Sequence, residues 1–435
     1  MCIKKDNLMK TPIAWVLAAV FSLGAMTAEA ADVSLSGFGT LGYAQSNQSY
    51  NYERFINHNG TFARDSVAGV QADIKFTDQI GATVQGKFAP SLKSDSSWDA
   101  TLNWAFLSWR PSNDWLIRLG KQRVPLYLHS ESLDVGATYD FALLPAEMYR
   151  LAPTNDYIGG SIEKAWNPDM GEFTLSVYAG NQKTSFRGFQ RDDIPGFPTQ
   201  RGMRAVPWNI KAEGAVLTLL RDEAKFRMGF HKITNTADPG RPFITAMPLV
   251  PAPAFGTTTG AAYVAGAFRD SVDSQVFTLA AEISLPKDFR LTGEYGRRKV
   301  DNMMTGIDSN GGYLALLKDI GAWTPYVSYA KIKSRSDVLG LYQSVNNNPG
   351  LSPVNSAKVA GINASQRVLA DALLVYDQNT IALGTSCRLT PTQKLKFEWA
   401  RTHVGVASSF VDAPPFGNVS KQNIDVLSFS YNFVF

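Results

Sequence analysis

Histidines, cysteines and paired carboxylates are the residues of this chain that could act in catalysis. Cys387 alternates with apolar neighbours, as a small apolar residue in a strand does. Glu131 and Asp134 are spaced like a carboxylate pair for hydrolysis, but this spacing is also common in acidic loops. No GxSxG, HExxH or similar spacing involves any of the four histidines, His58, His129, His231 and His403. These observations disfavour an enzyme and predict neither a metal nor a cofactor.

Charged residues offer a second kind of chemistry, the sorting of ions and polar solutes. The segment 125–157 carries four carboxylates, Glu131, Asp134, Asp140 and Glu147. Basic residues occupy polar positions of alternating segments elsewhere: Lys75, Lys87, Arg118, Arg227, Arg290, Arg298, Arg388 and Lys396. Acidic groups that face a basic wall across water create a field that selects solutes by charge and size.

We interpret the two charged sets as an acidic loop that faces a basic wall. Arg118 follows the polar parity of its segment and lies close before the acidic loop, so we expect it to face Glu131 and Asp134. The alternative for each residue is that it is only a solvated polar group on a wet face.

The segments that must position these residues alternate between apolar and polar side chains. One hairpin is expected where 277–285 and 289–295 flank the turn Pro286-Lys287-Asp288, and others where turns fall at 77–79, 111–114 and 390–392. About sixteen such strands follow one another, an even number, as antiparallel transmembrane β-barrels require. Lys211 and Glu213 share the parity of Leu217 and Leu219, which predicts either a bulge in that strand or a mistaken register.

A closed barrel is expected because hydrocarbon leaves no partner for unpaired backbone groups. An open soluble sandwich is the alternative for many short strands. It would not account for the aromatic residues near so many strand ends or for the aromatic C-terminus. A net charge of +4 over 435 residues, with no basic cluster, argues against a nucleic-acid-binding protein.

The first thirty residues carry the marks of an export signal. Lys4, Lys5 and Lys10 precede the apolar run 13–21, and Ala28-Glu29-Ala30 forms an A-x-A cleavage site. The apolar run is shorter than the ~20 residues that a membrane-spanning helix needs. We therefore predict a signal peptide at residues 1–30, with Met9 as an alternative start, and a single β-barrel domain at residues 31–435.

The mature chain resembles the Gram-negative outer-membrane porins. The resemblance rests on Ser36-Gly37-Phe38-Gly39-Thr40-Leu41-Gly42-Tyr43, on the segment 118–136, and on the terminal Tyr431-Asn432-Phe433-Val434-Phe435. It implies a 16-stranded barrel, often trimeric, with segment 125–157 folded inward as a constriction loop. It also implies that Phe435 is read by the outer-membrane assembly machinery, and that the partners are outer-membrane lipid and lipopolysaccharide.

Three functions remain open at this point. The first is a water-filled channel for passive diffusion of small hydrophilic solutes and ions. The second is a solute-specific channel, because the loops around Pro195, Pro207, Pro251 and Pro253 are long enough to shape an entrance. The third is a non-conducting scaffold or adhesin. A transporter with a plug domain is disfavoured because no plug precedes the first strand.

Overall fold

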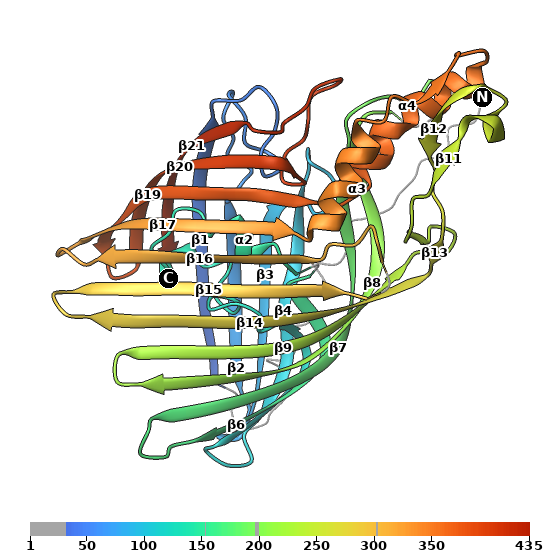
Figure 1. Cartoon of the computed structure of the whole chain (residues 1–435). Helices are drawn as coiled ribbons and strands as arrows, with labels where there is room; N and C mark the ends of the chain where they lie inside the picture. Colours follow the sequence, from blue (N-terminus) through green and yellow to red (C-terminus); the bar gives the residue numbers. More distant parts are fainter. Residues whose placement is uncertain (1–31, 153, 196–199, 302) are drawn as a thin grey trace, which may run out of the picture.

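The computed structural model describes residues 32–152, 154–195, 200–301 and 303–435. The signal peptide expected at residues 1–30 lies outside them. Within the described residues, sixteen antiparallel strands form one closed barrel (Figure 1). In ring order the strands are β1 (Asp32–Ser46), β2 (Val67–Lys75), β3 (Ile80–Pro90), β4 (Trp98–Trp109), β5 (Trp115–Arg123), β6 (Asp156–Trp166), β7 (Glu172–Gln190), β8 (Gly202–Arg221), β9 (Ala224–Ala237), β14 (Ser271–Leu285), β15 (Phe289–Val300), β16 (Ser309–Lys318), β17 (Trp323–Ser334), β19 (Tyr376–Thr390), β20 (Gln393–Ser408) and β21 (Asn423–Val434).

The connections divide into short turns at one end of the barrel and long loops at the other, which we name the turn end and the loop end. The hairpins of β14 to β20 show the turn end at the left of Figure 1, where the C-terminus also lies. The predicted turn at 286–288 is confirmed: Lys287 and Asp288 both adopt positive φ between β14 and β15. Positive φ at both positions suits the twist of a tight hairpin.

The barrel closes where the first strand pairs with the last. Phe38 lies opposite Val434, and the antiparallel register continues to Ser46 opposite Val426. The side chain of Phe435 covers Gly37, so that a Cβ at this glycine would overlap the ring. The ring of Phe433 covers Gly39 in the same way. The glycines in the first strand thus make room for the terminal aromatic residues, as an aromatic ring does when it shields a strand glycine.

The outer face of the barrel is apolar, as alternation predicted. In β7, Leu175 and Val177 are exposed on this face, whereas their neighbour Tyr178 is buried inside. Aromatic residues mark the strand ends: the rings of Trp166 and Phe173 stack at 5.6 Å beside the turn that joins β6 to β7. An apolar band bordered by aromatic residues is typical of a barrel that spans a membrane. None of the helices in the described residues is long and apolar enough to cross a membrane.

Strand β8 needs neither the bulge nor the altered register that its charged residues suggested. It pairs in continuous register with both β7 and β9. Lys211 and Glu213 point outward, well exposed, and their side chains approach to 3.3 Å nearer the loop end. Leu217 and Leu219 therefore point outward as predicted. The apolar band of β8 ends before it reaches the two charged residues, which lie nearer the loop end. A register shift occurs instead between β3 and β4, where Asn103 is the extra residue.

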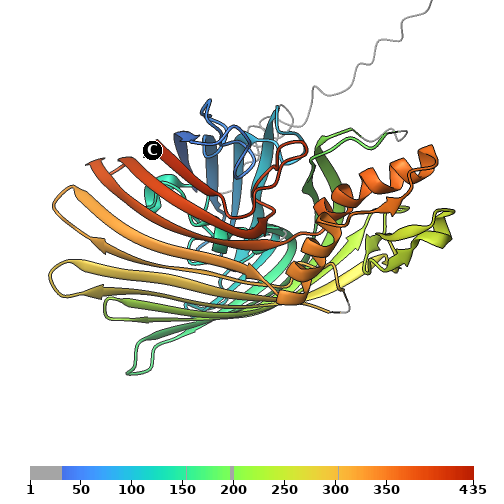
Figure 2. The same ribbon diagram turned by 45° about the horizontal axis from the view of Figure 1, so that its top comes forward.

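A small folded unit at the loop end was not predicted from the sequence, which suggested only long loops there. Its helices α3 (Ser336–Asn346) and α4 (Ala357–Asp371) project beyond the barrel (Figures 1 and 2). Val338, Val345 and Leu373 form its buried apolar core. Its other elements are a three-stranded sheet of β11 (Leu249–Pro251), β12 (Thr259–Tyr263) and β18 (Leu351–Ser352), the pair β10 (Phe243–Ile244) and β13 (Phe268–Arg269), and the 3-10 helix η3 (Ala252–Phe255).

Candidate functional site

The candidate site is the segment between β5 and β6, which we name the inner loop (residues 124–155, of which 153 is not described). It holds η2 (Gly136–Thr138) and the single-turn helix α2 (Ala146–Tyr149). Its helix contacts β15, β16 and β17, on the side of the ring away from β5. The structure thus places most of the segment that we expected to fold inward inside the barrel.

Apolar burial anchors the inner loop. Met148 is fully buried, and Tyr127 and Phe141 are almost so. They belong to one buried cluster with Ile210 and Ile233 of the barrel wall. Burial of a large apolar side chain stabilises by about 1.5–3 kcal/mol, so several of them hold the loop firmly.

This cluster changes the expected picture of a lumen that is wet on every side. Inward positions of β8 and β9 carry β-branched apolar residues, so both faces of these strands are apolar in places. A glycine in β16 lets the loop approach closely, because a Cβ at Gly311 would overlap the carbonyl oxygen of Glu147. The inner loop is therefore packed against an apolar part of the wall.

Asp134 attaches the loop to the near wall. It accepts hydrogen bonds from Lys87 Nζ of β3 at 2.7 Å and from Asn103 Nδ2 of β4 at 2.8 Å, and it pairs with Arg123 of β5. Asn103 is the bulged residue of β4, and the bulge turns its amide toward the loop. Neither Asn103 nor Arg123 was singled out from the sequence. Arg123 directly precedes the loop, which is the signal that could have identified it.

We expected Arg118 to face Asp134, but these two side chains do not pair. The guanidinium of Arg118 bonds to Glu163 of β6 at 2.8 Å and lies 3.9 Å from Glu131. Glu163 is within reach because β5 and β6 pair with Arg118 opposite Ser161, two residues before Glu163. Glu131 is 66% exposed, so it faces open space inside the barrel.

Asp140 attaches the inner loop to the far wall. Its carboxylate pairs with Arg290 of β15, lies 2.9 Å from Lys394 Nζ of β20, and accepts a hydrogen bond from Ser386 at 2.8 Å. Burial opposes ionisation of Asp140, but the charges of Lys394 and Arg290 outweigh it and hold its pKa below the usual range. Asp140 therefore remains ionised in the attached loop.

Glu147 behaves differently from the other loop carboxylates. It accepts hydrogen bonds from Gln378 Nε2 at 2.7 Å and from Thr380 Oγ1 at 2.5 Å, both on β19. It is almost fully buried, and burial raises its pKa. Glu147 thus anchors α2 through neutral partners.

Most of the predicted wall cations bind the inner loop rather than face open water. Arg227 donates to the carbonyl of Pro125 at 2.8 Å, Arg298 to that of Leu151 at 3.2 Å, and Lys396 to that of Phe141 at 2.9 Å. Arg298 and Lys396 are almost completely buried. The predicted positions are inside the barrel, but their partners are backbone carbonyls of the loop.

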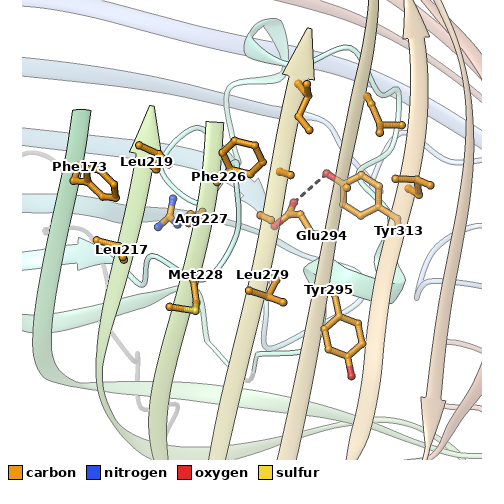
Figure 3. Close-up of a pocket in the computed structure, with 16 residues that line it drawn as sticks. Phe173, Leu217, Leu219, Phe226, Arg227, Met228, Leu279, Glu294, Tyr295 and Tyr313 are labelled. Atoms are coloured by element: carbon orange, nitrogen blue, oxygen red, sulfur yellow. Dashed lines mark hydrogen bonds between the residues drawn. The ribbon is translucent and has the colours of Figure 1, made fainter. Parts of the chain in front are cut away.

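Glu294 of β15 is a further anchor that was not singled out from the sequence. It accepts hydrogen bonds from Tyr149 Oη at 2.5 Å, from Tyr313 Oη at 3.0 Å and from the amide of Leu128 at 2.9 Å. Figure 3 shows its bond with Tyr313 of β16. Its inward parity in β15 was visible in the sequence, whereas its loop partners were not.

Comparisons with known proteins bear on the fold. The sequence matches no protein-family model and no curated protein. Many solved structures resemble the chain, and one of them is the outer membrane protein OmpT of Vibrio cholerae in a trimer form (13% identity, TM-score 0.52, covering 94% of this chain and 100% of that one). Two others are an anion-selective porin from Comamonas acidovorans (13%, 0.50, 93% and 100%) and OprB of Pseudomonas putida (10%, 0.51, 97% and 97%).

This chain has the porin fold. The fold class expected from the sequence, a transmembrane antiparallel barrel of sixteen strands, is confirmed. At such low identities the likeness concerns the fold alone.

A hollow on the outer surface of the porin-fold barrel is distinct from the inner-loop site. It measures about 600 Å³ and lies over β7 to β16 (Figure 3). Phe226, Met228 and Leu279, which face outward, line most of it with other apolar residues. Small residues, Ala281 and Gly293, lie between larger ones and leave room for the hollow. An apolar hollow on this face suits hydrocarbon rather than a polar solute.

Three of the four histidines of the porin-fold barrel have structural environments, and the fourth, His58, is exposed. His231 is buried and hydrogen-bonds to Tyr178 at 2.8 Å, and His403 bonds to Asn423 at 2.9 Å. His129 of the inner loop lies between the rings of Tyr139 and Tyr149, and burial lowers its pKa to about 4. Among the described residues, no group of three or more His, Cys, Asp or Glu side chains could hold a metal ion.

Proposed function

We propose that this chain is an outer-membrane channel through which small hydrophilic solutes and ions diffuse passively, without enzymatic activity. The observation that carries the proposal is the attachment of the inner loop to opposite walls of a closed barrel. Asp134 bonds to β3, β4 and β5, whereas Asp140 bonds to β15, β19 and β20. A segment held from both sides narrows the space between the walls.

The open space beside Glu131 has charged groups at its edge. Arg118 lies 3.9 Å away, and Glu163 forms the other side of the Arg118 pair. Half-buried polar side chains continue inside the barrel: Asp73 accepts hydrogen bonds from Gln71 at 2.7 Å and Thr83 at 2.7 Å. Fixed charges and polar groups at close quarters sort solutes by charge and size.

A narrow, solute-selective channel is favoured over a wide general one. The inner loop packs inside the barrel around an apolar cluster, and the unit of α3 and α4 stands at the loop end (Figure 1). We further propose that residues 1–30 direct export, that the turn end faces the periplasm, and that the loop end faces the exterior. A homotrimer in contact with lipid and lipopolysaccharide fits the exposed apolar residues of β1 and β2, such as Leu35 and Val70.

Single-channel recording in planar bilayers tests the proposal. The purified chain should give small steps, and a variant with residues 128–150 replaced by a short Gly-Ser segment should give larger ones. Glu131→Gln should shift the reversal potential in a salt gradient toward anions, because it removes an exposed negative charge from the lumen. Glu213→Gln, on the outer face, is the matched control and should leave it unchanged. Absence of current from both the chain and the loop-shortened variant would refute the channel.

A further inference from the structure

Strand β7 reaches far beyond the barrel wall at the loop end. It has 19 residues and β8 has 20, whereas β2 and β5 have 9 each. In the ring, β7 is the seventh of sixteen strands, and the loop 409–422 joins the fifteenth to the sixteenth. The separation is eight to nine steps out of sixteen, so β7 and this loop stand on opposite sides of the mouth.

Arg187 of β7 nevertheless forms ion pairs with a residue of this loop. Its guanidinium bonds to Asp412 in loop 409–422 through two nitrogens, at 2.8 and 2.6 Å. It also bonds to both oxygens of Asp95, in the loop 91–97 between β3 and β4, at 2.7 to 3.1 Å. Arg54, in the loop 47–66 between β1 and β2, bonds to Asp95 at 2.5 Å. We name these four residues, Arg54, Asp95, Arg187 and Asp412, the mouth clasp.

The mouth clasp is partly shielded from water, which strengthens its ion pairs. The side chains of Arg187 and Asp412 are 18% and 4% exposed. Burial opposes the charge of Asp95, but hydrogen bonds and charges from Arg187 and Arg54 outweigh it and lower its pKa. Bidentate arginine–carboxylate pairs are also the strongest and most directional kind.

The backbone beside Arg54 is strained. Glu53 and Arg54 adopt φ of 45° and 81°, in the left-handed region that disfavours residues with a side chain. Arg64 holds the carboxylate of Glu53, and Asp95 holds Arg54. Strain of this kind persists only where surrounding contacts impose it. Release of the clasp would therefore also release strain in loop 47–66.

The two residues that directly follow β7 make a second set of contacts beyond the clasp. Arg191 bonds to Asp371 of α4 at 2.6 Å and to Tyr342 Oη of α3 at 3.0 Å. The carboxylate of Asp192 bonds to Arg367 of α4 at 2.7 Å and accepts from the amide of Phe416 at 2.8 Å. Arg191 and Asp192 thus connect the folded unit at the loop end to the loop that carries Asp412.

We propose that the mouth clasp is a gate: when it is formed, it holds the extracellular mouth closed, and its release opens the route to Glu131. The gate proposal depends on the proposed channel function in one respect only, namely that solutes and ions pass through the opened mouth. The geometric basis is independent, because loops from opposite sides of the ring meet on one guanidinium. Loss of Arg187 removes every contact that joins β7 to Asp95 and Asp412 in the clasp.

Accessibility of the lumen tests the gate without requiring conduction. A reporter thiol is placed by Glu131→Cys in a Cys387→Ala background and is treated with a membrane-impermeant thiosulfonate reagent on cells that lack their own porins. With Arg187→Gln the thiol should react at least about tenfold faster, equivalent to 1.4 kcal/mol in the closing equilibrium. Arg187→Lys, which keeps the charge but loses the fork, should give an intermediate rate.

The matched control is Arg204→Gln on β8, because Arg204 belongs to the same hairpin but bonds to Gln190 and Gln200. Its rate should equal that of the parent. Asp412→Asn approaches the clasp from the other side and should also accelerate labelling, which covers a failure of the Arg187 variant to assemble.

Equal rates in Arg187→Gln, Asp412→Asn and the parent would overturn the gate, and so would equal acceleration by Arg204→Gln. Bilayer recordings of the same variants separate the two proposals. Faster labelling without current in any variant would leave the gate standing and refute the channel. Faster labelling with larger currents would support both.

Discussion

Asp140 makes ionic contacts with two wall cations at once. Asp140→Asn would leave Arg290 and Lys394 close together without their shared anion. Removal of one partner from a buried ion pair costs about 3–5 kcal/mol. We expect amides of residues 136–144 to exchange hydrogen faster and channel currents to become noisier. Asp319→Asn is the control, since Asp319 lies 4.0 Å from the same Arg290 but is 52% exposed; equal effects of both variants would contradict the anchoring role.

The pH dependence of this anchor follows from the lowered pKa of Asp140. A carboxylate whose pKa is lower in the folded state contributes its full stability above the ordinary value of about 4. The contribution is lost as the pH falls through the lower folded value. The Asp140 anchor should therefore persist in mildly acidic solution. Protection factors for hydrogen exchange, which correct for the intrinsic effect of pH on the exchange rate, should be similar at pH 7 and pH 5 for residues 136–144.

At the scale of residues, the sequence predicted which face of a strand a side chain occupies, but it did not predict the partner to which that side chain bonds. Alternation placed Arg118, Glu294 and Lys396 on inward positions, where the structure has them. The partner of Asp134 depended on the path of a loop without periodicity, and Arg123 rather than Arg118 stands where that path begins. The sequence cannot indicate which arginines bond to backbone carbonyls, because every residue has one.

Strand β7 provides a test of the two faces at the scale of elements. Val177 is exposed on the outer face, and its neighbour Ser176 points inward and is half-buried. In a bilayer, Val177→Arg should destabilise the barrel by about 2–4 kcal/mol, because lipid-facing arginine near the midplane is costly. Ser176→Arg should cost much less. Unfolding titrations in vesicles measure both, and a costlier Ser176 variant would mean that the faces are reversed.

Strands were more predictable than the segments between them. Hairpins such as β14–β15 carry both the alternation and the turn residues, so both strands could be placed. Helices α3 and α4 pack mainly against each other and against other loop segments, and their apolar positions do not follow a strong helical period. The lumen-facing side of such a strand is ordinarily polar and wet, yet Thr278 and Thr292 are buried. Apolar packing of the inner loop nearby explains the difference.

At the scale of the whole molecule, Phe435 takes part in closing the ring. Its amide donates to Gly37 O at 3.0 Å, and its carbonyl accepts from Gly37 N at 2.9 Å. Deletion of Phe435 removes both bonds and the ring over Gly37, so the fraction of assembled, heat-modifiable barrel on gels should fall. Phe416→Ala is the control, because Phe416 is apolar and 86% exposed in a loop. Normal assembly of the truncated chain would contradict this role.

Closure between the first and last strands also bears on the order of folding. Thr40 and Asn432 are hydrogen-bonded across 392 positions of sequence, whereas strands that follow one another around the barrel are joined by turns or loops of no more than 41 residues. Contacts of such long range form late, because the chain entropy they cost is recovered only once the intervening strands are in place. Until the final residues are synthesised, β1 remains a free edge able to pair with another chain. The nascent protein is therefore prone to aggregation over almost its whole length, and it depends on being kept apart from its copies until its last strand arrives.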